Sequence, residues 1–232
     1  MRAAERACRP NANESTSIRE NPQRFIMSFP DARERWNARF ADETYLFGTG
    51  PNAFLASQVA LLRPGMSALS VADGEGRNSV WLARQGLSVT AFDLSPVGVE
   101  KARRLARDAA VAVDYRIADV NEWDWDARTF DVVAAIFIQF ASPDERARIF
   151  AGIHRALAPG GLVILQGYTP RQLAYGTGGP PHAENMYTSA MLAEAFSDLE
   201  ILHLAEHDDV IHEGKGHDGM SALVDLVARR AR

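Results

Sequence analysis

Two glycines and two aspartates among the first 120 residues have the spacing of an adenosine-binding site. Gly74 and Gly76 lie in the stretch SVADGEGRN, residues 70–78, between an apolar run and a helical pattern. Asp93 follows Gly74 by about 20 residues, at the end of the next apolar run, where a carboxylate can accept both ribose hydroxyls. Asp119 ends a third apolar run and can bond an adenine amino group. A GxG pair alone also fits an ordinary turn, and an aspartate alone can cap a helix, so the combination carries the prediction.

Glu75 lies between the two glycines and bears on which adenosine ligand binds. A dinucleotide places its pyrophosphate against backbone amides at a helix N-terminus. A glutamate there would set a like charge beside the phosphates, and Asp73 adds a second acid. S-adenosylmethionine has no phosphate and brings a sulfonium and an ammonium group, which a carboxylate tolerates. The acids therefore favour S-adenosylmethionine over a nicotinamide dinucleotide.

Strands and helices that alternate regularly would bring these residues to one edge of a sheet. Strands are predicted at residues 66–72, 87–92, 112–117, 130–137 and 162–168, with helices at 78–85, 96–109 and 143–157. Ser95 followed by a proline predicts a helix start, and a further helix is predicted to start near Asn52. Ser142 with Glu145 predicts a capping box. This alternation predicts an open parallel sheet with right-handed crossovers, in which ligands bind at the carboxyl ends of the strands.

The C-terminal part departs from the alternation. Residues 199–206 and 222–228 are strand-like, and the glycine-rich segment between them has no helical periodicity. Such a connection suits a hairpin, so the last strand is predicted to be antiparallel. Residues 1–30 are polar and read as a flexible leader, which leaves residues 31–232 as a single domain.

The bulk composition excludes several classes of function. The formal net charge is −5, and the densest basic run, residues 101–107, has the spacing of a solvated helix face, so no nucleic-acid partner is expected. No apolar run approaches the roughly 20 residues of a membrane span, and no signal-peptide core is present. With Cys8 as the single cysteine, a cytoplasmic location is expected.

The order of motifs resembles the class I S-adenosylmethionine-dependent methyltransferases. The motifs are SVADGEGRNSVWLARQG, VTAFDLSPVGVEKAR, YRIADVNEW, FDVVAAIFIQF and LAPGGLVILQGY. GEGRNSVWLA, with WNARFADETYLFGTGPN upstream, is more narrowly similar to the tellurite-resistance and thiopurine methyltransferase-like small-molecule group. The resemblance implies an α/β, Rossmann-like, seven-stranded mostly parallel sheet with an antiparallel last strand and helices on both faces. It also implies S-adenosyl-L-methionine as cofactor and S-adenosyl-L-homocysteine as product.

The same resemblance assigns cofactor-binding positions. Gly74, Gly76, Asp93 and Asp119 match the family pattern, whereas Ser70 and Ala72 stand where the family usually has an acid and a glycine. The full expected set of cofactor contacts is Ala72, Asp73, Gly74, Gly76, Asn78, Asp93, Leu94, Asp119, Val120 and Ile136.

Substrate contacts are expected from the segment after the fifth strand. Residues 168–187 are rich in glycine, proline and aromatic residues and suit a lid. Glu213 and His217 fall in the hairpin loop above the same rim and are the candidate acid/base pair. Histidines 203, 207, 212 and 217 match no compact zinc spacing, so no metal is predicted. The expected substrate-lining residues are Tyr45, Gln139, Tyr175, His182 and Tyr187.

These residues together predict a small-molecule methyltransferase. The acceptor would be a thiol, a metalloid or a heteroaromatic metabolite, and the protein a monomer or homodimer. A non-catalytic S-adenosylmethionine-binding module and a methyltransferase for macromolecules remain as alternatives. A nicotinamide-dependent oxidoreductase is disfavoured by Glu75 and the antiparallel tail.

Overall fold

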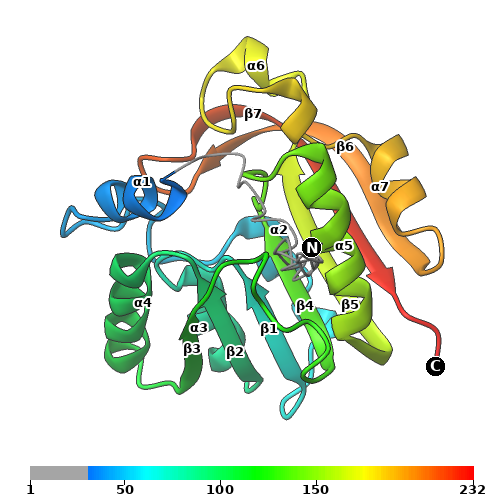
Figure 1. The fold of residues 1–232 in the computed structure, drawn as a ribbon, viewed down its shortest axis with the longest axis horizontal. Coiled ribbons are helices and arrows are strands. Elements are labelled where there is room, and N and C mark those ends of the chain that lie inside the picture. Colours follow the sequence, from blue (N-terminus) through cyan, green and yellow to red (C-terminus); the bar gives the residue numbers. More distant parts are fainter. Residues whose placement is uncertain (1–30) are drawn as a thin grey trace, which may run out of the picture.

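A seven-stranded sheet forms the centre of the computed structural model, which describes residues 31–232 (Figure 1). The proposed leader, residues 1–30, lies outside the described residues. The strand order is β3-β2-β1-β4-β5-β7-β6. β1 to β5 run parallel, and β7 is antiparallel to both β5 and β6, which confirms the predicted fold class. The strands are β1 (Ser67–Val71), β2 (Ser88–Asp93), β3 (Val113–Ile117), β4 (Phe130–Ile136), β5 (Leu157–Tyr168), β6 (Glu200–His212) and β7 (Asp218–Arg229).

Helices cover both faces of the sheet. Ile153 of α5 and Phe196, which follows α7, pack on one face in the main core. Leu55 of α2 and Leu82 of α3 pack on the other face, where Val99 of α4 also meets β2. The helices are α1 (Ala32–Arg39), α2 (Ala53–Ser57), α3 (Arg77–Arg84), α4 (Pro96–Asp108), α5 (Pro143–Ala156), α6 (Gln172–Tyr175) and α7 (Ser189–Ala195), with 3₁₀ turns η1 (Val59–Leu61) and η2 (Ala183–Asn185).

The predicted helix starts are confirmed by their capping hydrogen bonds. The Ser95 hydroxyl accepts from the Gly98 N–H at the start of α4. Ser142 and Glu145 form the predicted capping box of α5. Asn52 accepts from the Leu55 N–H at the start of α2. These local signals therefore determine the residues at which α2, α4 and α5 begin.

The C-terminal hairpin is longer than predicted. β6 continues to His212 and β7 begins at Asp218, so only residues 213–217 connect them. Residues 207–212 are mostly polar because β6 is an edge strand, and both of its faces are largely exposed there. β5 also begins earlier than predicted, at Leu157, because Gly160 and Gly161 form an irregularity within the strand and do not precede it.

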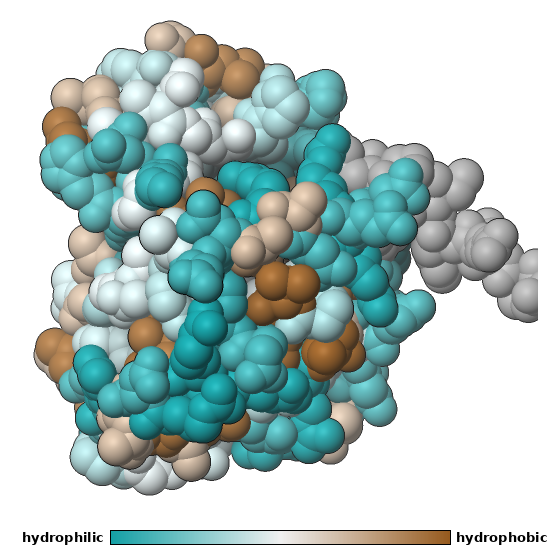
Figure 2. Space-filling view, turned by 90° about the vertical axis from the view of Figure 1, so that its left-hand side faces the viewer, coloured by the Kyte–Doolittle hydropathy of each residue, from teal (hydrophilic) through white to brown (hydrophobic). Residues whose placement is uncertain are grey.

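The molecular surface around α1 and α4 is mainly hydrophilic. Figure 2 views this side of the molecule and shows apolar residues in small, separate groups.

No helix among residues 31–232 is long and apolar enough to cross a membrane. The organisation of residues 31–232 as a single methyltransferase domain stays a prediction.

Candidate active site

A cavity of about 310 Å³ opens at the carboxyl ends of β1, β2 and β4. This is the point where the strand order reverses about β1, the usual ligand position in open α/β sheets. Trp36, Arg39, Phe40 and Phe47 line it from the N-terminal side. Nine of the ten predicted cofactor residues line it as well: Ala72, Asp73, Gly74, Asn78, Asp93, Leu94, Asp119, Val120 and Ile136.

Gly76, the tenth predicted cofactor residue, is not among the residues that line the cavity. It is the N-cap of α3 with φ 94°, a conformation in which glycine carries no steric penalty. A Cβ at this position would lie 2.7 Å from the Ala102 Cβ. Gly76 therefore allows α3 and α4 to pack closely, and its contribution to the site is indirect.

The Asp93 carboxylate is held rigidly at the end of β2. Its Oδ2 accepts from the Gly74 N–H at 2.9 Å, and its Oδ1 accepts from the Ser95 N–H at 2.8 Å. Each oxygen keeps a second lone pair for a ligand hydroxyl. Burial raises the pKa of Asp93 to about 6, so the group is ionised at neutral pH. The same side chain thus supports the turn and offers acceptors to a ribose.

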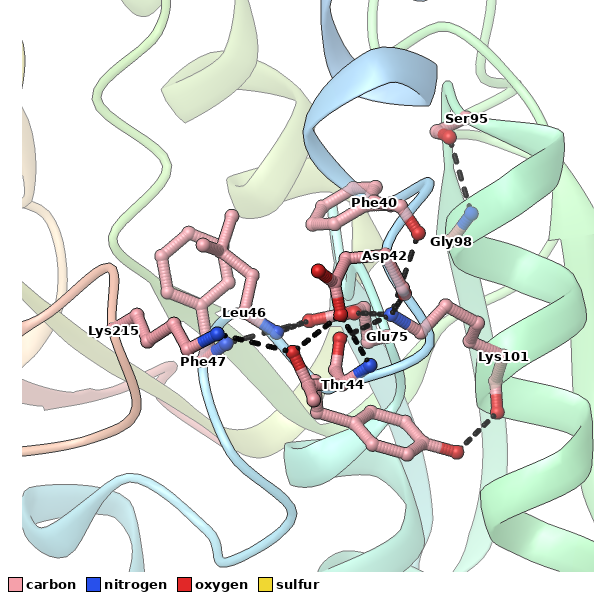
Figure 3. Close-up of polar contacts among 11 residues, drawn as sticks. Phe40, Asp42, Thr44, Leu46, Phe47, Glu75, Ser95, Gly98, Lys101 and Lys215 are labelled. Atoms are coloured by element: carbon pink, nitrogen blue, oxygen red, sulfur yellow. Dashed lines mark hydrogen bonds and ion pairs between the residues drawn. The ribbon is translucent and has the colours of Figure 1, made fainter.

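Glu75 does not face the cavity, contrary to the role predicted for it. Its carboxylate is buried against α4, where it pairs with the ammonium of Lys101 (Figure 3). The same carboxylate accepts from the N–H groups of Leu46 at 2.8 Å and Phe47 at 3.4 Å. The side chain therefore stabilises the neighbouring segment and does not select the charge of the ligand.

The Asp73 carboxylate is bonded to the first turn of α3, the kind of helix end where dinucleotides bind phosphate. Its Oδ1 accepts from the Ser79 N–H, 3.2 Å away in the first turn of α3, and from the Ser70 hydroxyl at 2.6 Å. The Ser79 hydroxyl donates to its other oxygen. An internal carboxylate thus takes a helix-terminal donor that phosphates use. The site still disfavours a pyrophosphate, but Asp73 is the residue responsible and Glu75 is not. The sequence feature that could have indicated this role of Asp73 is Ser70, which stands where the family usually has an acid.

Burial of Asp73 predicts a pH dependence of stability. Burial raises the pKa of this carboxyl from 3.8 to about 7. The folded state therefore binds more protons than the unfolded state between these pH values, and the stability from this group falls as pH rises through that window. We expect wild type to lose stability relative to Asp73→Asn from pH 5 to 7, by at most about 1.4 kcal/mol per pH unit. Urea unfolding of both proteins at each pH checks this, and parallel curves would contradict it.

Ala72 adopts a left-handed backbone conformation in the first turn. Its φ is 48°, which costs a residue with a Cβ about 1 kcal/mol. The family usually has glycine here. We expect Ala72→Gly to raise the free energy of unfolding by up to about 1 kcal/mol. Part of this gain is offset because glycine increases the conformational entropy of the unfolded chain. Ala147→Gly, at an exposed position inside α5, should instead lower it by about 0.5–1 kcal/mol. Urea unfolding measures both, and a loss of stability in Ala72→Gly would refute the strain.

Of the predicted substrate-lining residues, only Gln139 lines the cavity. Its side chain donates to the Tyr168 carbonyl at 2.8 Å and accepts from the Tyr168 N–H at 2.5 Å, which fixes the end of β5. The other four lie elsewhere: Tyr45 donates to the Lys101 carbonyl, Tyr175 bonds Asp208 on the surface, His182 is exposed beside Glu184, and Tyr187 is buried in the core against Phe150.

His217 lines the cavity, but Glu213 does not. Glu213 forms a buried ion pair with Arg77 at 2.7 Å and accepts from the Ala53 N–H at 3.0 Å. Burial alone would raise the pKa of Glu213. His217 at 3.9 Å, Arg77 and the Ala53 N–H outweigh this effect and lower the pKa to about 2. Glu213 is thus an ionised structural anion at neutral pH.

His217 packs between two aromatic rings. Its ring centroid lies 4.5 Å from that of Phe47 and 4.3 Å from that of Phe137. Burial lowers the pKa of His217, so the imidazole is neutral at pH 7 and a weak base. Within residues 31–232, no group of three or more His, Cys, Asp or Glu is arranged to hold a metal ion.

Comparison with known proteins identifies the central region. Residues 68–161 match the family model described as a methyltransferase domain. By this match the region is similar to methyltransferase domains. It is similar to ubiquinone biosynthesis O-methyltransferase of Xanthomonas campestris pv. campestris, with 36% identity over 113 residues, 48% of this chain and 46% of the relative. The enzyme of the same name in Methylocella silvestris is 34% identical over 104 residues. The chain thus spans about half the length of the curated relatives it matches.

Solved structures share the fold. Magnesium protoporphyrin IX methyltransferase (ChlM) from Synechocystis PCC 6803, solved with bound SAH, aligns with a TM-score of 0.66 and 17% identity over 86% of this chain and 97% of that chain. TehB from Haemophilus influenzae aligns with a TM-score of 0.64 and 14% identity over 85% of this chain and 66% of that chain. The solved structures confirm the class I fold predicted from the sequence, and the family match agrees with the predicted methyltransferase type.

Proposed function

We propose that this protein transfers a methyl group from S-adenosyl-L-methionine to a small-molecule acceptor. The carrying observation is the buried Asp93 carboxylate, aligned by two backbone N–H groups at the wall of a cavity of about 310 Å³. Asp73 supports the same ligand, since it occupies the helix terminus that a phosphate would need. The cavity residues thus suit an adenosine ligand without phosphates.

The residues of the chain would align the reactants and keep water out. When bound, S-adenosylmethionine supplies a methyl group on a positively charged sulfur. Asp93 and Asp119 would hold its adenosine part, and Phe47, Phe137 and His217 would enclose the acceptor. Alignment and exclusion of water are the main catalytic contributions such a site can make.

The acid/base groups favour an acceptor that ionises by itself. Glu213 is already ionised and paired, and His217 is a weak base, so neither is suited to deprotonating an alcohol. A thiol or an acidic heteroaromatic group needs little help near neutral pH. The relatives named as O-methyltransferases make an acidic hydroxyl the second class to test. We further propose a cytoplasmic monomer or homodimer that acts without nucleic acid, on the basis of composition and charge.

Calorimetry and a radiolabel screen test this function. S-adenosylhomocysteine is expected to bind, and NADH is not. Methyl-labelled S-adenosylmethionine is then offered with thiols, metalloid oxyanions, heteroaromatics and phenols, and transfer to one of them supports the proposal. Binding of NADH without the methyl donor would exclude it. Cofactor binding without transfer to any acceptor would favour a non-catalytic binding module or a different reaction. The fold is also similar to that of the [4+2]-cyclase SpnF, with a TM-score of 0.61 and 20% identity over 84% of this chain.

A further inference from the structure

Three buried polar atoms of residues that line the cavity have no hydrogen-bond partner among the described residues. They are Arg77 Nη1, Tyr168 Oη and His217 Nδ1. The three residues are 6%, 1% and 8% exposed. Leaving a buried donor unpaired is costly, and more so when the donor is charged. A ligand that supplies an acceptor here would remove that cost.

The Arg77 guanidinium is fixed in place before any ligand binds. Its Nη2 bonds Glu213 at 2.7 Å, and Glu213 in turn accepts from Asn52 Nδ2 and from the Ala53 N–H, each at 3.0 Å. One end of the planar fork is therefore occupied, while Nη1 is left for another group. A guanidinium held in this way suits a carboxylate or a similar oxyanion.

Aromatic side chains form the walls beside Arg77. The Phe137 ring lies 4.3 Å from His217 and 4.7 Å from Tyr168, measured between ring centroids. The backbone at Gly178 also borders this region, because a Cβ there would come within 2.9 Å of Tyr168 Oη. Aromatic walls of this kind favour a flat ring over a branched aliphatic ligand.

Charges of both signs line the cavity. Its acidic residues include Asp73, Asp93 and Asp119, and its basic residues are arginines 35, 39 and 77. We propose that the acceptor is a planar aromatic molecule that carries a carboxylate or comparable oxyanion, and that Arg77 binds this anion. This proposal rests on the proposed function, since it names the acceptor of the same site. The carboxylate of the cofactor's methionine part is the other possible source of the same anion.

Three matched thiols test the proposal in the methyl-transfer assay. 4-Mercaptobenzoate carries the anion, 4-mercaptobenzamide is its neutral counterpart, and 4-methylbenzenethiol has no polar group. We expect wild type to prefer the benzoate over the benzamide by about tenfold or more in kcat/KM. Arg77→Lys keeps a charge for Glu213 but loses the fork, and should remove most of this preference through KM. Arg116→Lys, in an exposed ion pair on β3, is the control.

Direct binding separates the possible failures. Calorimetry titrates benzoate into protein saturated with S-adenosylhomocysteine, and benzoate should bind wild type at least about tenfold more tightly than Arg77→Lys. An unchanged thiol preference in Arg77→Lys, with weakened S-adenosylhomocysteine binding, would assign Arg77 to the cofactor and overturn the proposal. Benzoate binding that depends on Arg77 without methyl transfer to any acceptor would support the anion site and reject the proposed function. No benzoate binding and no preference among the thiols would overturn the anion site alone.

Discussion

Asp93→Ala is expected to weaken the binding of S-adenosylhomocysteine by at least about 100-fold. The carboxylate is positioned by the N–H groups of Gly74 and Ser95, and it is the charged acceptor that the two ribose hydroxyls would use. Each hydrogen bond to a charged acceptor contributes about 1.5–3 kcal/mol, so the loss of two exceeds a factor of 100 in affinity. Calorimetry at pH 7.5 is the measurement, because Asp93, with its pKa near 6, is ionised there.

Two controls separate a lost contact from a damaged fold. Asp114→Ala removes an exposed carboxylate of β3 that pairs with Arg116, and it should leave the affinity unchanged. Asp93→Asn keeps one oxygen acceptor and should fall between Asp93→Ala and wild type. Thermal unfolding confirms that each variant is folded. If folded Asp93→Ala bound S-adenosylhomocysteine with wild-type affinity, the ribose would lie elsewhere and the assigned cofactor position would be wrong.

The position of Asp93 could be predicted because its determinants are local. An apolar run, Ser95 and Pro96 together place an aspartate at a strand end just before a helix, and β2 does end at Asp93. The capping signals at Asn52 and Ser142 are equally local and equally correct. Their hydrogen bonds join residues within a few positions of each other, so the sequence contains all that is needed.

The direction of Glu75 could not be predicted because its partners are remote. Its ion pair is with Lys101 on α4, and its hydrogen bonds are with Leu46 and Phe47 in the segment before α2. No sequence period connects these elements. The same limitation applies to Glu213, whose partner Arg77 comes from α3, and to Tyr187, whose neighbours belong to α5 and the core. The carboxyl ends of β1 to β5 were therefore predictable, whereas the length of the C-terminal hairpin and side-chain partners across elements were not.

Lys101→Met is expected to lower the free energy of unfolding by about 3–5 kcal/mol. The change would leave the Glu75 carboxylate buried without its cation, and removing one partner of a buried pair carries a cost of that size. Lys101 Nζ also donates to the carbonyls of Phe40, Asp42 and Thr44, at 3.3, 2.8 and 2.7 Å (Figure 3). Urea unfolding measures the loss. Arg107→Met, on the exposed side of the same helix, should cost less than about 1 kcal/mol.

The same variant should also weaken cofactor binding, because the Glu75–Lys101 pair holds a wall of the cavity. Residues 40–47 accept hydrogen bonds from Lys101 and donate hydrogen bonds to Glu75, and Phe40 and Phe47 of this segment line the cavity. The double variant Glu75→Gln/Lys101→Met removes the stranded charge while its amide oxygen can still accept from Leu46. It should therefore recover part of the stability of Lys101→Met, and the three carbonyls left without Lys101 should keep binding of S-adenosylhomocysteine below that of wild type. If Lys101→Met lost stability but bound the cofactor product normally, segment 40–47 would not be required for the site. If neither property changed, the buried pair would have no structural role.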